Sequence, residues 1–390
     1  MSEKIAIAEG KITDEALREW QDRIGLNLRI SHVFNSTVSH EAIRNYVNGI
    51  GDNNPLYRDE EYAKQTTYGE LVAPPSWLYS VFPTWVLQGL RGIHSFHSGN
   101  DWVFFQPIML GDTIEAECKF IGYDVKPSKF SKKTVFEYQR SDFYNQRNEL
   151  VARTNVWMVR AERRTARKTG KYVSIQLPHP YTDEELEKID EEVLEEEIRG
   201  STPRYWEDVR KDEELPAVVR GPLGLTDSIA YCVGASPVQL AAHGSQLKLY
   251  RKHPAWAFRD PATRAWEPMH GVHYNKTAAN AAGLPYPYDV GTQRQGWLMS
   301  MLCSWMGDEG WLKSNYAEYR RFVYYSDVVW LHGKVINKYI DGNGEHCVDI
   351  ETRAVNQRGE ETMPGYSIVV LPSRDHGKWP VKKRVSKFKT

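Results

Sequence analysis

The chain has 390 residues, of which 41% are hydrophobic, 26% charged and 12% aromatic, a composition typical of a globular protein with a sizeable core. Its 50 basic and 51 acidic residues leave a net charge of -1, which excludes a global field that would attract nucleic acid or an anionic membrane. A domain usually holds about 150 residues, so this length predicts two domains.

The cysteines and the first residues indicate the cellular compartment. Cys118, Cys232, Cys303 and Cys347 are isolated in the sequence, and their spacing fits neither a CxxC pair nor a zinc site, which favours free thiols in a reducing compartment. The first 20 residues lack the basic and apolar regions of a signal peptide, and no apolar stretch reaches the roughly 18 residues of a transmembrane helix. We therefore expect a cytoplasmic protein.

The first predicted elements are two helices and a strand. Residues 12–25 have amphipathic helical spacing, and Asp14 is placed to cap that helix. Residues 30–38 have the pattern of a strand, and Ser39 is a suitable N-cap for the next helix, which ends at two glycines. The loop that follows directly, residues 51–57, reads GDNNPLY.

A turn and four strands complete the first half. Two prolines before Ser76 predict the start of a longer apolar helix. Residues 101–126 read as two strands around a Gly-Asp turn, and residues 132–159 as a hairpin around residues 145–148. One helix backed by several antiparallel strands is an α+β unit.

Residues 161–200 are a linker of changing composition. They begin basic, pass through two prolines and end in an acidic run. The run could be an interaction tail, but its apolar residues recur at helical spacing, so we predict a linker helix that lies on the protein. The residues of that apolar face are Leu186, Ile189, Val193 and Ile198.

The first half then repeats. Residues 221–234 match residues 36–49 in apolar spacing, tyrosine and closing glycine. Two later correspondences keep the same order, one aligning Asp327 with Asp112 and one aligning the turn at 356–360 with the turn at 145–149. Three matches at similar spacing indicate a tandem duplication.

The repeat predicts the domain boundaries. Between the second helix and its site loop lies an insertion that contains Trp256, Phe258 and Trp266, and we expect this aromatic segment to cover or widen a pocket. The predicted units are an N-terminal domain at 1–165, a linker at 166–203, a C-terminal domain at 204–374 with the insertion at 235–268, and a flexible basic tail at 375–390.

The loop after the first helix contains residues suited to acid/base chemistry. Asp52 follows a helix end and stands beside Asn54 and Pro55. Its carboxylate could deprotonate a water molecule that the Asn54 amide holds in place. Alternatively, Asp52 and Asn54 make only local side-chain to backbone bonds within the turn.

This loop also carries a family resemblance. Residues 46–59, together with Tyr62-Ala63 and Ala73-Pro74-Pro75, resemble the hydratase motif of MaoC-like enoyl-CoA hydratases and dehydratases, in the branch similar to the N-terminal dehydratase half of fatty acid synthases. With its C-terminal echo, the resemblance covers most of residues 30–160 and 204–374. It implies an α+β double hotdog fold, in which each half wraps an antiparallel sheet around a central helix. It also implies acyl thioester substrates, usually coenzyme A esters, bound between the halves.

The resemblance assigns different roles to the two halves. The family pattern is Asp-x-Asn-Pro-(Ile or Leu)-His, and this chain has Tyr57 at the histidine position. A phenol with a pKa near 10 is a poor base at neutral pH. The resemblance therefore implies that the N-terminal half, with Asp52, accommodates the acyl group, and we predict that Tyr57 and Trp77 contact substrate.

The second site loop supplies the missing imidazole. Residues 268–275 place His273 at the family's histidine position and His270 at its asparagine position, with proline at the aspartate position. We predict that His273 moves the proton, while His270 or a carboxylate such as Glu267 or Asp289 orients the water. The two histidines could instead be satisfied loop residues or part of a metal site, but nearby ligands lack metal spacing, so we predict no metal.

The thioester oxygen also needs hydrogen-bond donors. The backbone amides of Gly291 and Thr292, which open an apolar helix pattern, would suit a developing enolate. Arg294 could meet a phosphate or carboxylate of the substrate, or form a surface salt bridge.

These expectations combine into one hypothesis with two rivals. The leading hypothesis is a hydro-lyase that reversibly adds water to a 2-enoyl-CoA to give the 3-hydroxyacyl-CoA, without a cofactor and with coenzyme A as part of the substrate. The aromatic insertion favours a bulky acyl group, and we expect a homo-oligomer. The rivals are a non-catalytic thioester-binding partner of a heteromeric hydratase and a different lyase or thioesterase acting on an acyl-CoA.

Overall fold

A computed structural model describes residues 10–127, 133–162 and 175–377 of the chain. The basic start of the predicted linker and most of the predicted C-terminal tail lie outside these residues. The described helices are α1 (Asp14–Gln21), α2 (His40–Ile50), α3 (Glu60–Lys64), α5 (Asp183–Leu194), α6 (Leu225–Ala235), α7 (His243–Lys252), α8 (Lys276–Ala281) and α9 (Gly291–Met306). Short 3-10 segments include Pro55–Tyr57, Pro75–Ser80 and Met269–His273.

Within the described residues, the strands form one large antiparallel sheet and two small ones. The first half contributes β1 (Asn27–Leu28), β2 (Val72–Ala73), β3 (Ile93–Phe104), β4 (Ile108–Met109), β5 (Glu115–Lys126), β6 (Thr134–Tyr144) and β7 (Leu150–Glu162). The second half contributes β8 (Val218–Arg220), β9 (Ala257–Arg259), β10 (Trp266–Pro268), β11 (Trp311–Glu318), β12 (Val329–Ile340), β13 (His346–Asn356) and β14 (Glu361–Val370).

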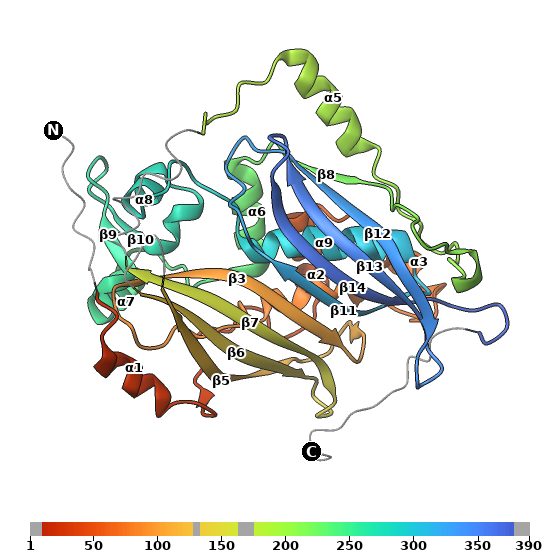
Figure 1. The fold of residues 1–390 in the computed structure, drawn as a ribbon, viewed down its shortest axis with the longest axis horizontal. Coiled ribbons are helices and arrows are strands. Elements are labelled where there is room, and N and C mark those ends of the chain that lie inside the picture. The colour runs from red at the N-terminus through yellow and green to blue at the C-terminus, as the bar shows by residue number, and fades with distance from the viewer. Residues whose placement is uncertain (1–9, 128–132, 163–174, 378–390) are drawn as a thin grey trace.

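The two halves join edge to edge in this sheet. Its ten strands run in the order β1-β5-β6-β7-β3-β11-β14-β13-β12-β8, and β3 pairs with β11 at the centre, from Ser314 opposite Val103 to Glu318 opposite Gly99. The C-terminal strands wrap around α9 (Figure 1), whose residues from Thr292 onward are all buried. The predicted α+β double hotdog fold is confirmed.

Equivalent side-chain hydrogen bonds in the two halves support the predicted duplication. In the first half the buried Asp112 carboxylate accepts a bond from the Gln146 amide at 2.8 Å, and in the second half Asp327 accepts one from Gln357 at 2.7 Å. The arginine after each glutamine also bonds its aspartate. The same residue types in the same places therefore brace the same hairpin against the same turn in both halves.

Two glycines bring α2 and α6 into direct backbone contact. A Cβ atom on Gly49 would lie 2.8 Å from the Cα of Tyr231, and one on Gly234 would lie 2.7 Å from the Cα of Tyr46. The tyrosine rings of the pair stand 6.2 Å apart. The contact is reciprocal, because the residues that the repeat aligns with one another meet across the helix pair.

The linker helix and the insertion both pack on the double hotdog. Ile189 of α5 is buried with Val219 and Val328, which confirms a linker helix lying on the protein. The insertion contains α7, β9 and β10 and lies at the end of the sheet where β3 begins (Figure 1). Its Phe258 is buried in a cluster that includes Val272 of the second site loop.

Three local predictions were wrong. Thr13, and not Asp14, caps α1, because its hydroxyl accepts the Ala16 amide at 3.2 Å. Residues 30–38 form no continuous strand, since their backbone groups pair in pieces with residues near 80 and with Asp112. The segment after the two prolines is only a short 3-10 helix that ends at Ser80, and Pro83 disfavours helical geometry at the residue before it.

The reciprocal glycine contact predicts a destabilising substitution. In Gly234→Ala the added methyl group would lie 2.5 Å from the backbone oxygen of Asn45, so the helices must separate, and we expect the free energy of unfolding to fall by about 1–3 kcal/mol. Gly244→Ala in α7 is the control, because its methyl group would meet nothing within 4 Å. Urea denaturation measures both variants, and equal stabilities would show that the helix contact tolerates a side chain.

Candidate active site

Asp52 lies in a buried turn after α2. Gly51, with a φ of 66°, turns the chain so that Asp52 is only 1% exposed. One carboxylate oxygen accepts the Asn54 amide at 2.9 Å, and Asn54 in turn accepts the Leu56 amide at 3.0 Å. These are the local turn bonds that the sequence left as an alternative. The second oxygen of Asp52 makes no hydrogen bond of ordinary length among the described residues, although the Ser300 hydroxyl lies near enough to act on the carboxyl group.

The surroundings of Asp52 favour its protonated form. Burial raises the pKa of its carboxyl group above the ordinary value, and the Asn54 amide and the Ser300 hydroxyl oppose that rise only in part. Ser300 belongs to α9. Asp52 therefore contributes a buried polar group at the middle of the central helix of the other half.

Tyr57 lines a small cavity between the halves. The cavity measures about 40 Å³, and its walls come from the motif at Asn54 and Tyr57 and from the end of α9 at Cys303 and Asp308. Such a volume holds a few water molecules, so an acyl group would have to widen it. Burial raises the pKa of Tyr57 well above its usual range, and the phenol cannot act as a base at neutral pH.

Trp77 does not line this cavity. Its side chain is fully buried, in the 3-10 segment Pro75–Ser80, and it is not among the residues that line the cavity. The predicted contact between Trp77 and substrate remains a prediction.

His273 is held in one tautomer. Its Nδ1 lies 3.0 Å from the carbonyl oxygen of Tyr288. A carbonyl oxygen only accepts hydrogen bonds, so Nδ1 carries the proton and Nε2 of the neutral ring keeps its lone pair. Burial lowers the pKa of His273, while the bond to Tyr288 and the charge of Asp289 act in the opposite direction. The neutral ring with a free Nε2 is the form that a general base requires.

His270 stands beside His273 and lacks a protein partner. The ring centroids are 4.7 Å apart, and both nitrogens of His270 are buried without a hydrogen bond to the described residues. Burial, followed by the proximity of His273, lowers the pKa of His270 well below its ordinary value. Two neutral imidazoles on one turn can hold a water molecule and take its proton.

Asp289 and Arg294 are bound to each other. Two bonds of 2.7 and 2.8 Å join the guanidinium to the carboxylate, and the two side chains are 3% and 0% exposed. Arg294 also donates to the backbone oxygens of Arg321 and Thr362. The pair therefore ties the start of α9 to the chain segment after β11, and its groups are committed within the protein.

The start of α9 lies close to His273 in the chain fold. Gly291 is the first residue of this 16-residue helix, and Val290 before it supplies no capping side chain. The amides of Gln293 and Arg294 donate to the Val290 carbonyl oxygen, which leaves those of Gly291 and Thr292 to donate to a ligand. A Cβ atom at position 291 would lie 2.6 Å from the ring of Tyr319. Only glycine lets that ring pack against the helix start.

Asp52 and His273 belong to separate centres. Asp52 lies against Ser300, whereas His273 contacts Tyr288, just before α9 begins. The nine residue steps from Gly291 to Ser300 correspond to about 13.5 Å of helix. The carboxylate of one motif and the imidazole of the other therefore do not form one acid/base pair across the halves.

A buried network missed in the sequence holds α9 in place. The amide oxygen of Gln295 accepts the hydroxyls of Tyr79 and Tyr319 at 2.7 and 2.6 Å, and its nitrogen donates to Asn315 at 2.6 Å. Tyr79 comes from the N-terminal half, so the network crosses between the halves. The signal was present, because three long polar residues at 293–295 open a helix pattern that is otherwise largely apolar.

His97 is a second missed residue near this centre. It lies on β3, its ring stands 5.0 Å from that of Tyr319, and its Nε2 lies 2.5 Å from the side-chain oxygen of Asn100. Burial lowers its pKa to about 4. The N-terminal half thus places a neutral histidine beside the ring that covers Gly291.

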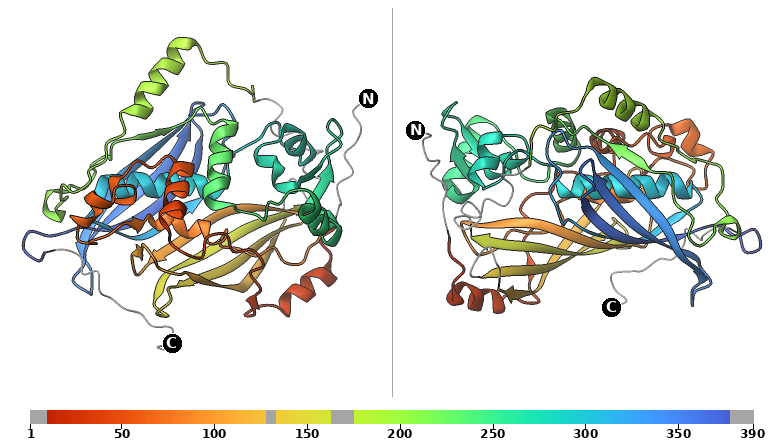
Figure 2. Two further views of the ribbon diagram at one scale, coloured as in Figure 1. Left: turned by 180° about the vertical axis from the view of Figure 1, so that it is seen from behind. Right: turned by 45° about the horizontal axis from the view of Figure 1, so that its top comes forward.

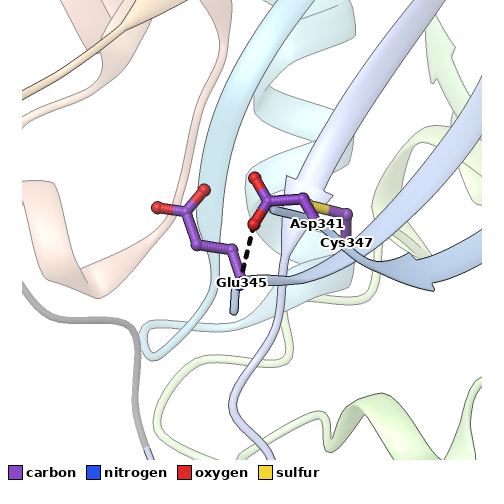
Figure 3. Close-up of side chains that lie close together, drawn as sticks. All are labelled: Asp341, Glu345 and Cys347. Carbon is purple, nitrogen blue, oxygen red and sulfur yellow. Dashed lines mark hydrogen bonds between the residues drawn. The ribbon is translucent and has the colours of Figure 1, made fainter. Parts of the chain in front are cut away.

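One cluster has the spacing of metal ligands among the described residues. Asp341, Glu345 and Cys347 offer ligand atoms within 4.8 Å of one another (Figure 3). The ammonium group of Lys313 donates to both carboxylates, at 2.7 and 2.8 Å. This cation already compensates the two acidic groups, and the cluster lies outside the two motifs.

Two further predictions concern the whole chain. All four cysteines are free thiols, as predicted. Within the described ranges, no helix has both the length and the apolar character that crossing a membrane requires.

Sequence comparison finds a family match in the first half and relatives that match part of the chain. The family model described as the FAS1-like dehydratase domain region matches residues 10–154. A UPF0336 protein of Streptomyces avermitilis is 31% identical over 101 residues, which cover 23% of this chain and 67% of that protein. A UPF0336 protein of a Parafrankia species is 48% identical over 46 residues, which cover 12% of this chain and 30% of that protein.

Structural comparison covers both halves. A solved structure named MaoC-like dehydratase aligns with 90% of this chain and 99% of its own, at a TM-score of 0.62 and 15% identity. A putative MaoC domain protein dehydratase from Chloroflexus aurantiacus aligns with 90% of this chain and 96% of its own, at a TM-score of 0.54 and 12% identity. At such identities the likeness establishes the fold.

The buried ion pair of Arg294 with Asp289 predicts a change in stability. Arg294→Met leaves the buried Asp289 charge without its partner, and we expect the free energy of unfolding to fall by about 3–5 kcal/mol. Arg374→Met is the control, because its pair with Asp208 is more than half exposed and such pairs contribute about 0–1 kcal/mol. Unchanged stability of Arg294→Met with weaker substrate binding would instead favour the predicted role in contacting substrate.

Proposed function

Because the chain belongs to the MaoC-like hydratase and dehydratase family, we propose that it is a hydro-lyase that adds water to a 2-enoyl thioester and removes it from the 3-hydroxyacyl thioester. The observation that carries the proposal is the bond of 3.0 Å from Nδ1 of His273 to the Tyr288 carbonyl oxygen. It leaves Nε2 as a free base next to the start of a long buried helix. The N-terminal motif lacks an equivalent base.

In the proposed reaction, His273 takes a proton from a water molecule as the water oxygen attacks C3 of the enoyl group. Charge then develops on the thioester oxygen, and the free amides at Gly291 and Thr292 stabilise it. The enolate collapses by taking a proton at C2, which His273 can return. His270, whose nitrogens make no hydrogen bond to the described part of the chain, holds the attacking water.

The substrate and assembly are further parts of the proposal. We propose a coenzyme A thioester, and an acyl group with a bulky or ring-containing portion, since His273 stands 4.5 Å from the ring of Tyr288, which itself stands 4.6 Å from Phe322. No cofactor takes part in the proposed steps. A cytoplasmic homo-oligomer completes the proposal.

Substitution of the base tests the reaction directly. We expect His273→Ala to lower kcat by about 10²–10⁴-fold, the usual contribution of a general acid/base, when enoyl-CoA absorbance is followed over a panel of acyl groups. His253→Ala, in the insertion, is the control, because this ring stacks on Trp256 and has no part in the proposed steps. Failure of the wild-type protein to turn over any ester that it binds would favour the non-catalytic thioester-binding alternative.

The buried position of His273 also predicts the pH dependence. Protonation removes the base, and burial lowers its pKa below the ordinary 6.5. We therefore expect kcat/KM to be constant near neutral pH and to fall only in acid, with a midpoint below 6.5. Asp52→Asn should leave this midpoint in place, because Asp52 lies at the other centre. If the Asp52→Asn substitution shifts the midpoint, the assignment of His273 as the base is wrong.

A further inference from the structure

Helix α6 carries three large aliphatic residues on its outer face. Leu225, Ile229 and Val233 follow one another every four residues and are 49%, 52% and 54% exposed. The buried face of the same helix includes Ser228. This is the reverse of the usual arrangement, in which a surface helix turns its apolar stripe toward the core.

The duplication supplies an internal reference for this face. The match of Tyr46 with Tyr231 and of Gly49 with Gly234 aligns α2 with α6. At the three outward positions α2 has His40, Arg44 and Asn48, which are all exposed. The two helices therefore have the same exposure at these positions but opposite chemistry: polar on α2 and apolar on α6.

The apolar stripe continues beyond the helix. Val33 and Phe34, 45% and 40% exposed, run beside the end of α6, because the Asn35 side chain donates to the Gly234 oxygen at 3.1 Å. Leu240, 41% exposed, lies in the loop after the helix. We call these six residues the α6 patch, and Figure 2 shows α6 on the outer side of the α9 layer.

We propose that the α6 patch is a two-fold interface between two copies of this chain. Its six side chains expose on the order of 500 Å², near the upper limit for a monomer. A two-fold contact that buries the patch of both copies covers about 1,000 Å², the lower limit for a specific interface. Residues spaced by four form a ridge that packs against an identical helix.

The charge of the patch favours a second copy over other partners. The three stripe residues are uncharged, and the nearby carboxylate of Asp227 is bound to the Gly224 amide at 2.6 Å. An uncharged ridge is complementary to itself and has nothing to attract a strongly charged partner. The interface is independent of the proposed reaction, since no patch residue lies in either motif.

The test installs the residues of α2 on α6. The variant Leu225→His, Ile229→Arg, Val233→Asn carries side chains that the same position in the other half already exposes to solvent, so the fold should be retained. Sedimentation equilibrium of the full chain should give a dimer for the wild type and a dissociation constant raised at least about 100-fold for the variant. Circular dichroism and thermal unfolding report folding, and Ile229→Arg alone serves if the triple variant is unstable.

Sedimentation equilibrium also measures the control variant and the outcomes that would overturn the proposal. Leu194→Arg replaces an apolar residue on α5 that is 84% exposed and should leave the dimer intact. A wild-type chain that is monomeric at every concentration overturns the proposal, as does a folded triple variant that still forms the dimer. Enoyl-CoA turnover per chain separates this result from failure of the proposed reaction.

Discussion

The burial of α9 on every side is the constraint on which the rest of the structure depends. A helix without a solvent-facing side depends on the protein for partners of its polar groups, and Gln295 and Arg294 of α9 find theirs in both halves. Gln295 bonds Tyr79 of the first half and Asn315 of the second, while Arg294 is bound by Asp289. This helix also places the candidate chemistry, because its start lies near His273 and its later turns reach Asp52 and the small cavity.

Duplication created two equivalent places for a site, and the chain has used them differently. Both halves keep the aspartate that braces the hairpin and the glycine at the helix contact, because backbone geometry depends on them in each half. The first motif keeps its carboxylate but has a buried phenol in place of the imidazole. The second has two neutral histidines. The outward face of the overlying helix has diverged as well, from polar on α2 to apolar on α6.

Much of the fold followed from local patterns. As expected, Ser39 caps the start of α2 and Gly51 ends it, since capping and a left-handed turn are properties of a few neighbouring residues. The aligned turns at 145–149 and 356–360 were found for the same reason. The segment after Pro75 was overestimated, because its length depends on Pro83 and on packing against α9. The strand expected at 30–38 does not form, because its backbone bonds are divided between two separate segments and do not follow one neighbouring strand.

By itself, the sequence determined the duplication and the two site loops, because these depend on spacing along the chain, and the resemblance of the first loop to a known motif implied the double hotdog fold. Tertiary structure decided what those residues can do. Only folding could place Arg294 and Asp289 in one buried pair, bond His273 to the Tyr288 carbonyl, and separate Asp52 from the histidines along α9. These outcomes depend on contacts between residues far apart in sequence and on the loss of water around them, and no local pattern records either.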